Sequence, residues 1–246
     1  MSEPTYRSFL VVDVENSESL TNVQVEAMRA SLYHIIEGGL PDAGAGVDQE
    51  DRGDAVMLIL DVPALDVLDR VVGGVLAGVR RHNSAAGPMN WLRVRIAVNE
   101  GYVGRDDKGW SSDSLTATFR MNSEDAVKKA LERAPRADAV VVVSDQVFCG
   151  LVRHSYRETV TPNEYRSVTM LSKSGEHRIW IRVPGYPEPP LLRPDSAAKR
   201  STDGDTGKTQ APGSDRDEAT IRATNFIGGS AIVGTQVGRD NINGRS

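Results

Sequence analysis

Two aspartates stand beside short apolar runs in this sequence. Asp13 ends the run at residues 9–12, and Asp54 follows Gly53 and precedes the run at residues 55–60. Short continuous apolar runs of this kind are typical of buried strands. If the two strands are neighbours, both carboxylates lie at one edge of a sheet, where a divalent cation can bind them. The alternative is that each aspartate only caps a turn or a helix.

Local patterns predict the elements that position these residues. Thr21 and Gln24 fit a capping box, and the following residues are apolar at helical spacing. Pro63 occupies the favoured first turn of a second helix. Further strands are predicted at residues 8–14, 46–49, 91–98, 137–143, 156–160, 165–171 and 178–183, and further helices at 113–132 and 145–151.

Residues 91–98 alternate apolar and basic side chains, with Arg93 and Arg95 on the basic side. Such alternation is typical of a strand with one face in water, so both arginines are predicted on solvated sheet surface. The polar residues 99–112 after this strand are predicted to form a loop, which has room for a hairpin.

This order of elements predicts an α+β domain at residues 6–184, with a largely antiparallel sheet and helices packed on it. Several prolines follow Val183, and residues 185–218 are predicted to be a disordered linker. Residues 219–246 regain β-branched residues among glycines and amides, which indicates a short β-prone tail that is too small to fold alone.

Composition restricts the function classes. The net charge is −5 and no long basic run occurs, which argues against nucleic acid as a partner. Cys149 is the one cysteine, so an intramolecular disulfide framework is excluded and a reducing cytoplasm is expected. No apolar run approaches the roughly 20 residues that a membrane helix needs. The four histidines are scattered, without spacing for zinc.

Four short motifs, in the same order, resemble class III adenylate/guanylate cyclases. Residues 9–13 resemble the first metal-binding strand of the family, and residues 52–57 resemble its Gly-Asp metal-binding hairpin. Residues 93–101 are similar to the next core strand, and residues 115–121 to the helix that carries the transition-state residues. The resemblance implies a nucleotide-cyclase-like palm fold over residues 6–184.

The resemblance also implies roles for individual residues. Asp13 and Asp54 would hold two Mg²⁺ (or Mn²⁺) ions, which activate the ribose 3′-hydroxyl of a nucleoside triphosphate. Arg120 would come from the partner subunit of a homodimer and offset charge on the phosphate. Glu50 falls where the family reads the base, and Lys173 lies near the position of a triphosphate-binding lysine.

The chain departs from the family pattern in the transition-state half of the site. Thr116 stands where the family has an asparagine, and Asn99 stands where histidine is common. Losing one transition-state hydrogen-bond donor costs roughly two to three orders of magnitude in rate, although threonine keeps a hydroxyl. By this resemblance, Thr116 and Arg120 are the candidate catalytic residues.

The tail provides a second resemblance. Residues 231–244 are similar to bacterial amyloid signalling motifs of the RHIM-like type, with Thr235-Gln236-Val237-Gly238 at the central step. Short β-branched pairs with Asn and Gln favour stacked, in-register strands. The resemblance implies a partner protein that carries a similar tail; the alternative is a tail without function.

Two function classes follow. As an enzyme, the chain would form a cyclic 3′,5′-nucleotide from GTP or ATP when it is dimerised or recruited through its tail. As a non-catalytic module, the domain would bind a nucleotide or dimerise as an adaptor in assembly-based signalling.

Overall fold

The computed structural model describes residues 3–40, 46–87, 90–172 and 175–191. The predicted tail at 219–246 and most of the predicted linker lie outside these residues, and so does Lys173. Within the described ranges, no helix is long and apolar enough to cross a membrane.

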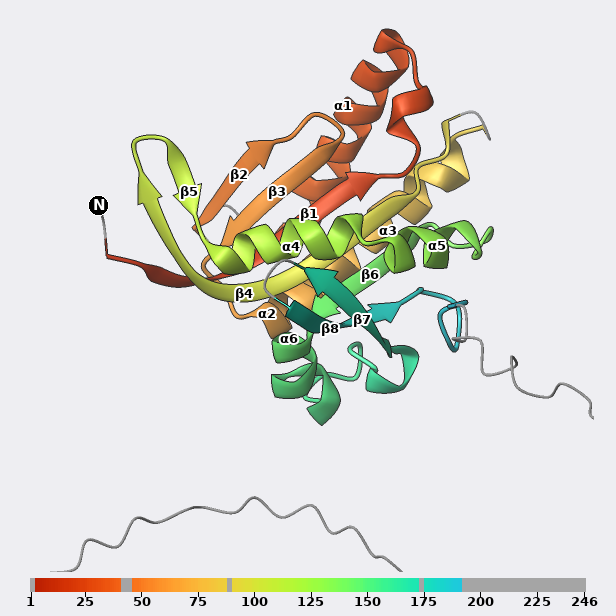
Figure 1. Ribbon diagram of the computed structural model, residues 1–246. Coiled ribbons are helices and arrows are strands. Elements are labelled where there is room, and N and C mark those ends of the chain that lie inside the picture. The colour runs from red at the N-terminus through yellow and green to blue at the C-terminus, as the bar shows by residue number, and fades with distance from the viewer. Residues whose placement is uncertain (1–2, 41–45, 88–89, 173–174, 192–246) are drawn as a thin grey trace, which may run out of the picture. The chain divides into compact units, whose positions relative to one another are not determined.

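The first half of the chain forms three neighbouring strands and two helices (Figure 1). Strand β1 is followed by a short 3-10 turn, helix α1, the hairpin β2–β3 and a helix that begins as α2, passes through a π-helical turn and continues as α3. Their bounds are β1 Thr5–Val14, η1 Ser17–Ser19, α1 Asn22–Gly39, β2 Val47–Asp51, β3 Ala55–Leu60, α2 Ala64–Asp66, η2 Val67–Val71 and α3 Val72–Ala85.

The second half adds the remaining strands and the helices of the opposite face. Strand β4 is long and turns back through β5 into helices α4 and α5, and β6, α6 and the hairpin β7–β8 complete the domain. Their bounds are β4 Val94–Asp106, β5 Gly109–Ser111, α4 Asp113–Ser123, α5 Asp125–Glu132, β6 Ala139–Ser144, α6 Asp145–Gly150, η4 Val152–His154, η5 Pro162–Glu164, β7 Arg166–Ser172 and β8 Gly175–Arg182.

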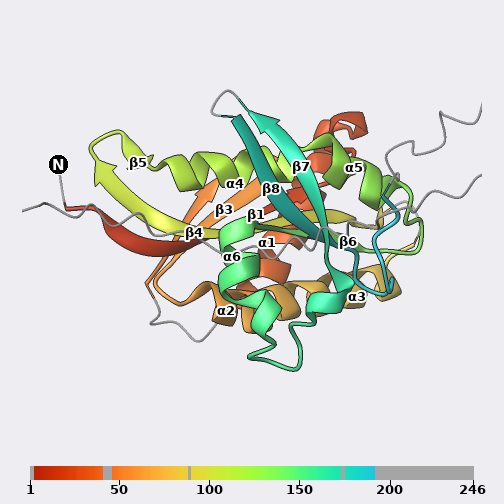
Figure 2. The ribbon, with the colours of Figure 1, turned by 60° about the horizontal axis from the view of Figure 1, so that its bottom comes forward.

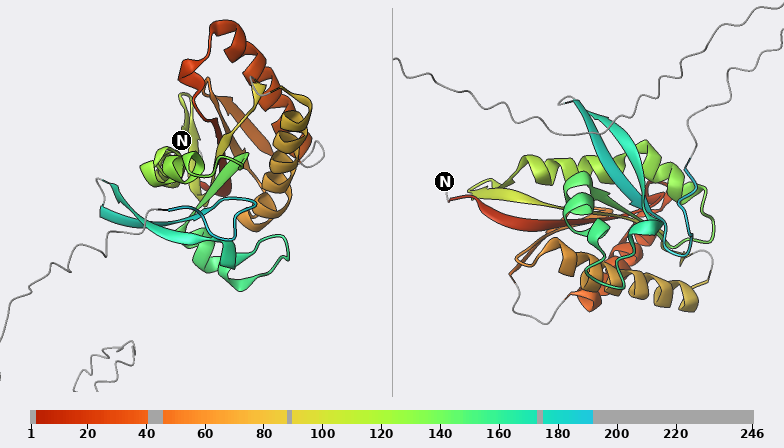
Figure 3. Two further views of the ribbon diagram at one scale, coloured as in Figure 1. Left: turned by 90° about the vertical axis from the view of Figure 1, so that its right-hand side faces the viewer. Right: turned by 90° about the horizontal axis from the view of Figure 1, so that it is seen from below.

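The strands form one sheet in the order β2-β3-β1-β4-β6-β8-β7, and β5 pairs with β4. All neighbouring strands are antiparallel except β4 and β6, which are parallel. Helices α1 and α3 cover one face of the sheet and α4 and α5 cover the other (Figures 2 and 3). This arrangement confirms the predicted α+β domain with a largely antiparallel sheet.

The sequence patterns explain the elements next to the two aspartates. Strand β3 is buried along its whole length, as its continuous apolar run predicts. In α1 the predicted apolar face is buried, and the Oε1 atom of Gln24 accepts a hydrogen bond from the backbone N–H of Thr21. Gly53 has a φ of 88° between β2 and β3, a left-handed conformation that glycine adopts without strain.

Three predictions from sequence were wrong in detail. Residues 156–160 form a turn and not a strand, because the Arg157 guanidinium pairs with Asp66 and the loop packs beside α2. The helix predicted at 113–132 is two helices, since Glu124 has an extended ψ of 135°. Residues 99–106 extend strand β4, which places the expected loop in the β4–β5 hairpin.

The prediction that Arg93 and Arg95 lie on a solvated face of the sheet was also wrong. The two side chains are 22% and 13% exposed, and each pairs with a carboxylate of the β1 region. Helices α4 and α5 cover this face, so alternating polarity here does not mark a solvated surface.

Candidate functional site

Strands β1 and β3 bring Asp13 and Asp54 together. Asp13 stands opposite Ala55 in the antiparallel register, and Asp54 precedes Ala55 directly. The backbone N–H of Val14 donates to the carbonyl of Asp54 at 3.1 Å, which fixes the ends of the two strands against each other. The predicted meeting of two carboxylates at one edge of the sheet is therefore present in the fold.

Each carboxylate is held by a protein donor through its Oδ2 atom. The Ser17 hydroxyl donates to Asp54 Oδ2 at 2.5 Å, and an Arg95 Nη2 group donates to Asp13 Oδ2 at 2.7 Å. The second oxygen of Asp13, Oδ1, is buried and has no hydrogen-bond partner among the described residues, and the same is true of Arg95 Nε. Buried polar atoms without partners are uncommon, and a water molecule or an ion can satisfy them.

Burial raises the pKa of the Asp13 carboxyl above 3.8 because the charged form loses solvation. The hydrogen bond and charge of Arg95 lower this pKa in part, the nearby Asp54 raises it, and Lys128 lowers it slightly. Burial is the largest of these effects, and a proton or a bound cation would offset the cost of keeping this carboxylate charged.

The raised pKa predicts how stability depends on pH. Between 3.8 and the raised value, the folded state binds more protons at Asp13 than the unfolded state does, so the contribution of Asp13 to stability falls as pH rises through this window. The free energy of unfolding of Asp13→Asn, minus that of the wild type, should rise with pH across the window and then stay level. Urea unfolding of both proteins at a series of pH values measures this difference in unfolding free energy. A difference that stays flat or falls as pH rises contradicts the prediction.

The two carboxylates fit a divalent cation. No group of three or more Asp, Glu, His or Cys side chains suited to a metal occurs in the described part of the chain. Magnesium nevertheless commonly uses one or two protein carboxylates and completes its shell with water and substrate phosphates. The unpartnered Oδ1 of Asp13 beside Asp54 matches that requirement.

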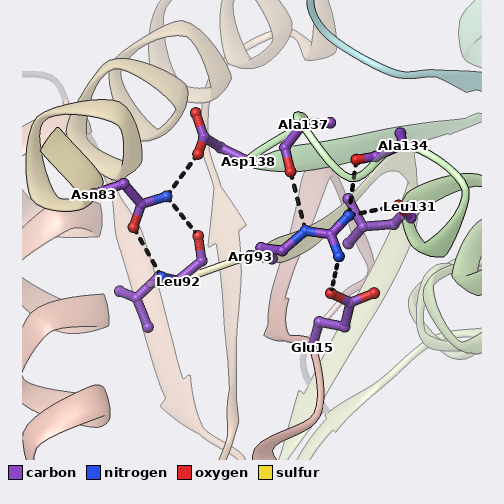
Figure 4. Close-up of polar contacts among 8 residues, drawn as sticks. All are labelled: Glu15, Asn83, Leu92, Arg93, Leu131, Ala134, Ala137 and Asp138. Atoms are coloured by element: carbon purple, nitrogen blue, oxygen red, sulfur yellow. Dashed lines mark hydrogen bonds and ion pairs between the residues drawn. The ribbon is translucent and has the colours of Figure 1, made fainter. Parts of the chain in front are cut away.

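Arg93 holds together the end of the sheet that carries the carboxylates (Figure 4). Its guanidinium donates to the carbonyls of Ala137, Leu131 and Ala134 and pairs with Glu15 at 2.8 Å. The backbone N–H of Glu15 in turn donates to the Arg93 carbonyl. Arg93 thus ties the segment after Asp13 to the end of α5.

Asn83 forms the second part of this network (Figure 4). Its side chain is buried, donates to the Leu92 carbonyl and to Asp138, and accepts from the backbone N–H of Leu92. The start of β4 is therefore fixed from α3 on one side and from the loop before β6 on the other.

Sequence reasoning missed the roles of Arg93 and Arg95. The available signal was charge complementarity across strands: Arg95 stands directly opposite Asp13 in the register of β1 and β4. Opposite charges at such positions stabilise each other, and this pairing becomes visible only once the strand order is known.

Glu50 lies in β2, at the edge of the sheet, opposite Met57. Its carboxylate pairs with Arg52 at 2.8 Å, and the Arg52 guanidinium lies 5.7 Å from the centre of the Phe119 ring. The predicted base-reading residue is thus held by a cation that also contacts α4, the helix of Thr116 and Arg120.

Thr116 and Arg120 are exposed on α4, one helical turn apart. Both line a cavity of about 820 Å³, which Asn99, Asp145, Arg178 and Ser172 of other elements also line. The Thr116 hydroxyl donates to the Ser112 carbonyl, so its proton is used within the helix. Ser172 is the last described residue before Lys173.

The structure therefore separates the predicted site residues into two groups. Asp13 and Asp54 meet at the end of β1, and neither lines the cavity of Thr116 and Arg120. Within one chain, the candidate cation ligands therefore do not share this cavity with the candidate catalytic residues.

No protein-family model matches the sequence, and no curated protein matches it significantly. Among solved structures, the fold is similar to an adenylate/guanylate cyclase/hydrolase from Silicibacter pomeroyi, with a TM-score of 0.56 and 16% identity over 75% of this chain and 100% of that one. The catalytic core of a rhodopsin-guanylyl cyclase in complex with ATPαS gives a TM-score of 0.47 and 15% identity, over 74% of this chain and 98% of that one. The described domain has a cyclase-like fold.

Proposed function

We propose that the domain binds a nucleoside triphosphate together with divalent cations at Asp13 and Asp54, and that a dimer forms a cyclic 3′,5′-nucleotide from it. The observation that carries the proposal is the adjacency of these two carboxylates, with a buried oxygen of Asp13 that has no partner among the described residues. When bound, the cations would acidify the ribose 3′-hydroxyl and offset charge on the α-phosphate.

The Glu50 carboxylate supports a nucleotide ligand. It lies on the edge strand β2, in the hairpin that leads to Asp54, and is suited to accept hydrogen bonds from a base.

The separation of the two groups of residues supports a site shared between subunits. Thr116 and Arg120 are exposed and do not line a common cavity with their own Asp13 and Asp54. In a two-fold dimer, one subunit presents its α4 to the carboxylates of the other, which generates two equivalent sites. Arg120 would then stabilise charge on the reacting phosphate in its partner.

A complementation experiment tests the shared site. Asp54→Asn and Arg120→Ala, each inactive alone, should regain about a quarter of wild-type activity when equal amounts are mixed, because half of the dimers then contain one intact site of two. Cyclic product from GTP and from ATP is measured with Mg²⁺ or Mn²⁺. If the wild type is active but the mixture recovers no activity, a site built from both subunits is ruled out.

The hydrogen bond made by the Thr116 hydroxyl favours a second function, one without catalysis. This hydroxyl donates to the Ser112 carbonyl, so it has to turn away from the helix to act as the donor that the family's asparagine supplies. A domain with this change would bind cations and nucleotide and dimerise without turnover, as an adaptor. Metal-dependent nucleotide binding by the purified full chain without cyclic product distinguishes this function from the cyclase.

The tail motif at residues 231–244 is proposed to recruit the domain to a partner protein with a similar tail. It carries β-branched pairs and amides that favour in-register stacking. A peptide of residues 219–246 should form β-rich fibrils, measured by thioflavin fluorescence and electron microscopy. A matched peptide with Gln236→Pro should stay monomeric, and a wild-type peptide that stays monomeric would contradict the proposal.

A further inference from the structure

Four buried side-chain atoms lack a hydrogen-bond partner among the described residues, and three of them belong to β1, β4 and α4, which pack on one another. They are Asp13 Oδ1, Arg95 Nε and Asn122 Oδ1. The first two belong to one ion pair. Asn122 is 2% exposed and lies in the last turn of α4, on the buried face of that helix with Leu115, Thr118 and Met121.

The geometry of α4 on β4 places Asn122 at the level of Arg95. Helix α4 follows the β4–β5 hairpin and runs back over β4 in the opposite direction (Figure 1). Its start is anchored where Asn99 Nδ2 donates to the Ser114 carbonyl at 2.9 Å. Eight helical residues onward cover about 12 Å, and four strand residues from Asn99 back to Arg95 cover about 13 Å.

The next helix supports this placement. Lys128, in α5, is close enough to Asp13 to lower the pKa of that carboxyl. Asn122 lies in the last turn of α4, just before Glu124 ends this helix and α5 begins. Its position on the buried face of α4, at this level along β4, directs Asn122 toward the part of the sheet that holds the Asp13–Arg95 pair.

We propose that Asn122 is a positioning residue that accepts the Arg95 guanidinium when Arg95 leaves Asp13. This inference deepens the proposed function, since a cation on Asp13 competes with the positive charge of Arg95. A guanidinium that loses a buried carboxylate needs another acceptor, because an unpaired buried charge is strongly unfavourable. Asn122 Oδ1 would supply that acceptor and so increase the affinity of the carboxylates for the cation.

A double-mutant cycle without any metal tests the contact. In the wild type, Asn122→Leu removes an oxygen that has no partner, so the urea midpoint should be unchanged or slightly higher. In an Asp13→Ala background, Arg95 depends on Asn122, and the same substitution should lower the midpoint clearly. Equal effects of Asn122→Leu in both backgrounds would overturn the proposal. Should Asp13→Ala fail to fold, Asp13→Val serves as the background, because valine fills a similar volume and offers Arg95 no acceptor.

Cation binding provides the second readout. Asn122→Leu should weaken Mn²⁺ binding to the full chain by about tenfold, as expected for the loss of an outer-shell partner, and Asn122→Asp should restore or exceed wild-type affinity. Unchanged Mn²⁺ affinity in Asn122→Leu would also overturn the proposal. Wild-type protein that binds no Mn²⁺ would instead contradict the proposed function, and the metal-free cycle would still decide whether Asn122 receives Arg95.

Thr118→Val is the matched control for both measurements. Thr118 is fully buried on the same face of α4, but its hydroxyl donates to the Ser114 carbonyl within the helix. The substitution should therefore have equal effects on stability in both backgrounds and leave Mn²⁺ affinity unchanged. If Thr118→Val also lowers the urea midpoint only in the Asp13→Ala background, the effect is one of general packing. That result would contradict a specific acceptor role for Asn122.

Discussion

Replacing Asp54 with asparagine should weaken Mn²⁺ binding by at least about hundredfold and abolish any metal-dependent cyclic product. Loss of an outer-shell partner alone costs about ten- to hundredfold in metal affinity, so loss of a ligand's charge should cost at least the upper value. Asparagine keeps the size of the side chain and one acceptor. If that oxygen accepts from Ser17, as Asp54 Oδ2 does, the amide NH₂ group faces the cation and repels it.

Mn²⁺ titration followed by electron paramagnetic resonance measures this affinity, with and without a nucleoside triphosphate. Asp61→Asn is the control, because Asp61 forms an exposed ion pair with Arg7 and is 57% exposed. It should bind Mn²⁺ as the wild type does. The cation assignment would be wrong if Asp54→Asn bound Mn²⁺ within about threefold of the wild type, since that difference is far below the loss of a ligand.

The parts of the site that depend on local pattern could be predicted from the sequence. A continuous apolar run is sufficient to predict β3 and to place Asp54 at its start, because burial of both faces leaves a signal in every residue. The same reasoning places Asp13 at the end of β1. Their adjacency followed from the assumption that the two strands are neighbours, which the register confirms.

The partners of these carboxylates could not be predicted in this way. Arg95 meets Asp13 across 82 residues of sequence, and nothing local in the alternating strand distinguishes a solvated face from one covered by later helices. Ser17 holds Asp54 across 37 residues, through a turn in which Asn16 has a φ of 59°. Contacts of this kind depend on strand order and on helix placement, which a single sequence does not specify.

Arg93→Met should lower the free energy of unfolding by about 3 kcal/mol or more, the largest effect on stability that we expect from a single polar side chain here. Methionine retains the length and apolar stem of arginine. It leaves the carbonyls of Leu131, Ala134 and Ala137 without their donor and leaves Glu15, which is 10% exposed, without its cation. Removal of one partner from a buried charged network costs far more than the network itself contributes.

Urea unfolding of the full chain, followed by circular dichroism, measures this loss. Arg7→Met is the control, since its partner Asp61 is 57% exposed and the ion pair should contribute less than about 1 kcal/mol. If Arg93→Met does not fold, Arg93→Lys provides the measurement, because lysine keeps the charge but cannot reach four acceptors with one ammonium group. A lysine variant as stable as the wild type would show that charge alone is required. In that case the segment after Asp13 would be fixed by Glu15 and the β1–β4 ladder, and not by the guanidinium contacts to the end of α5.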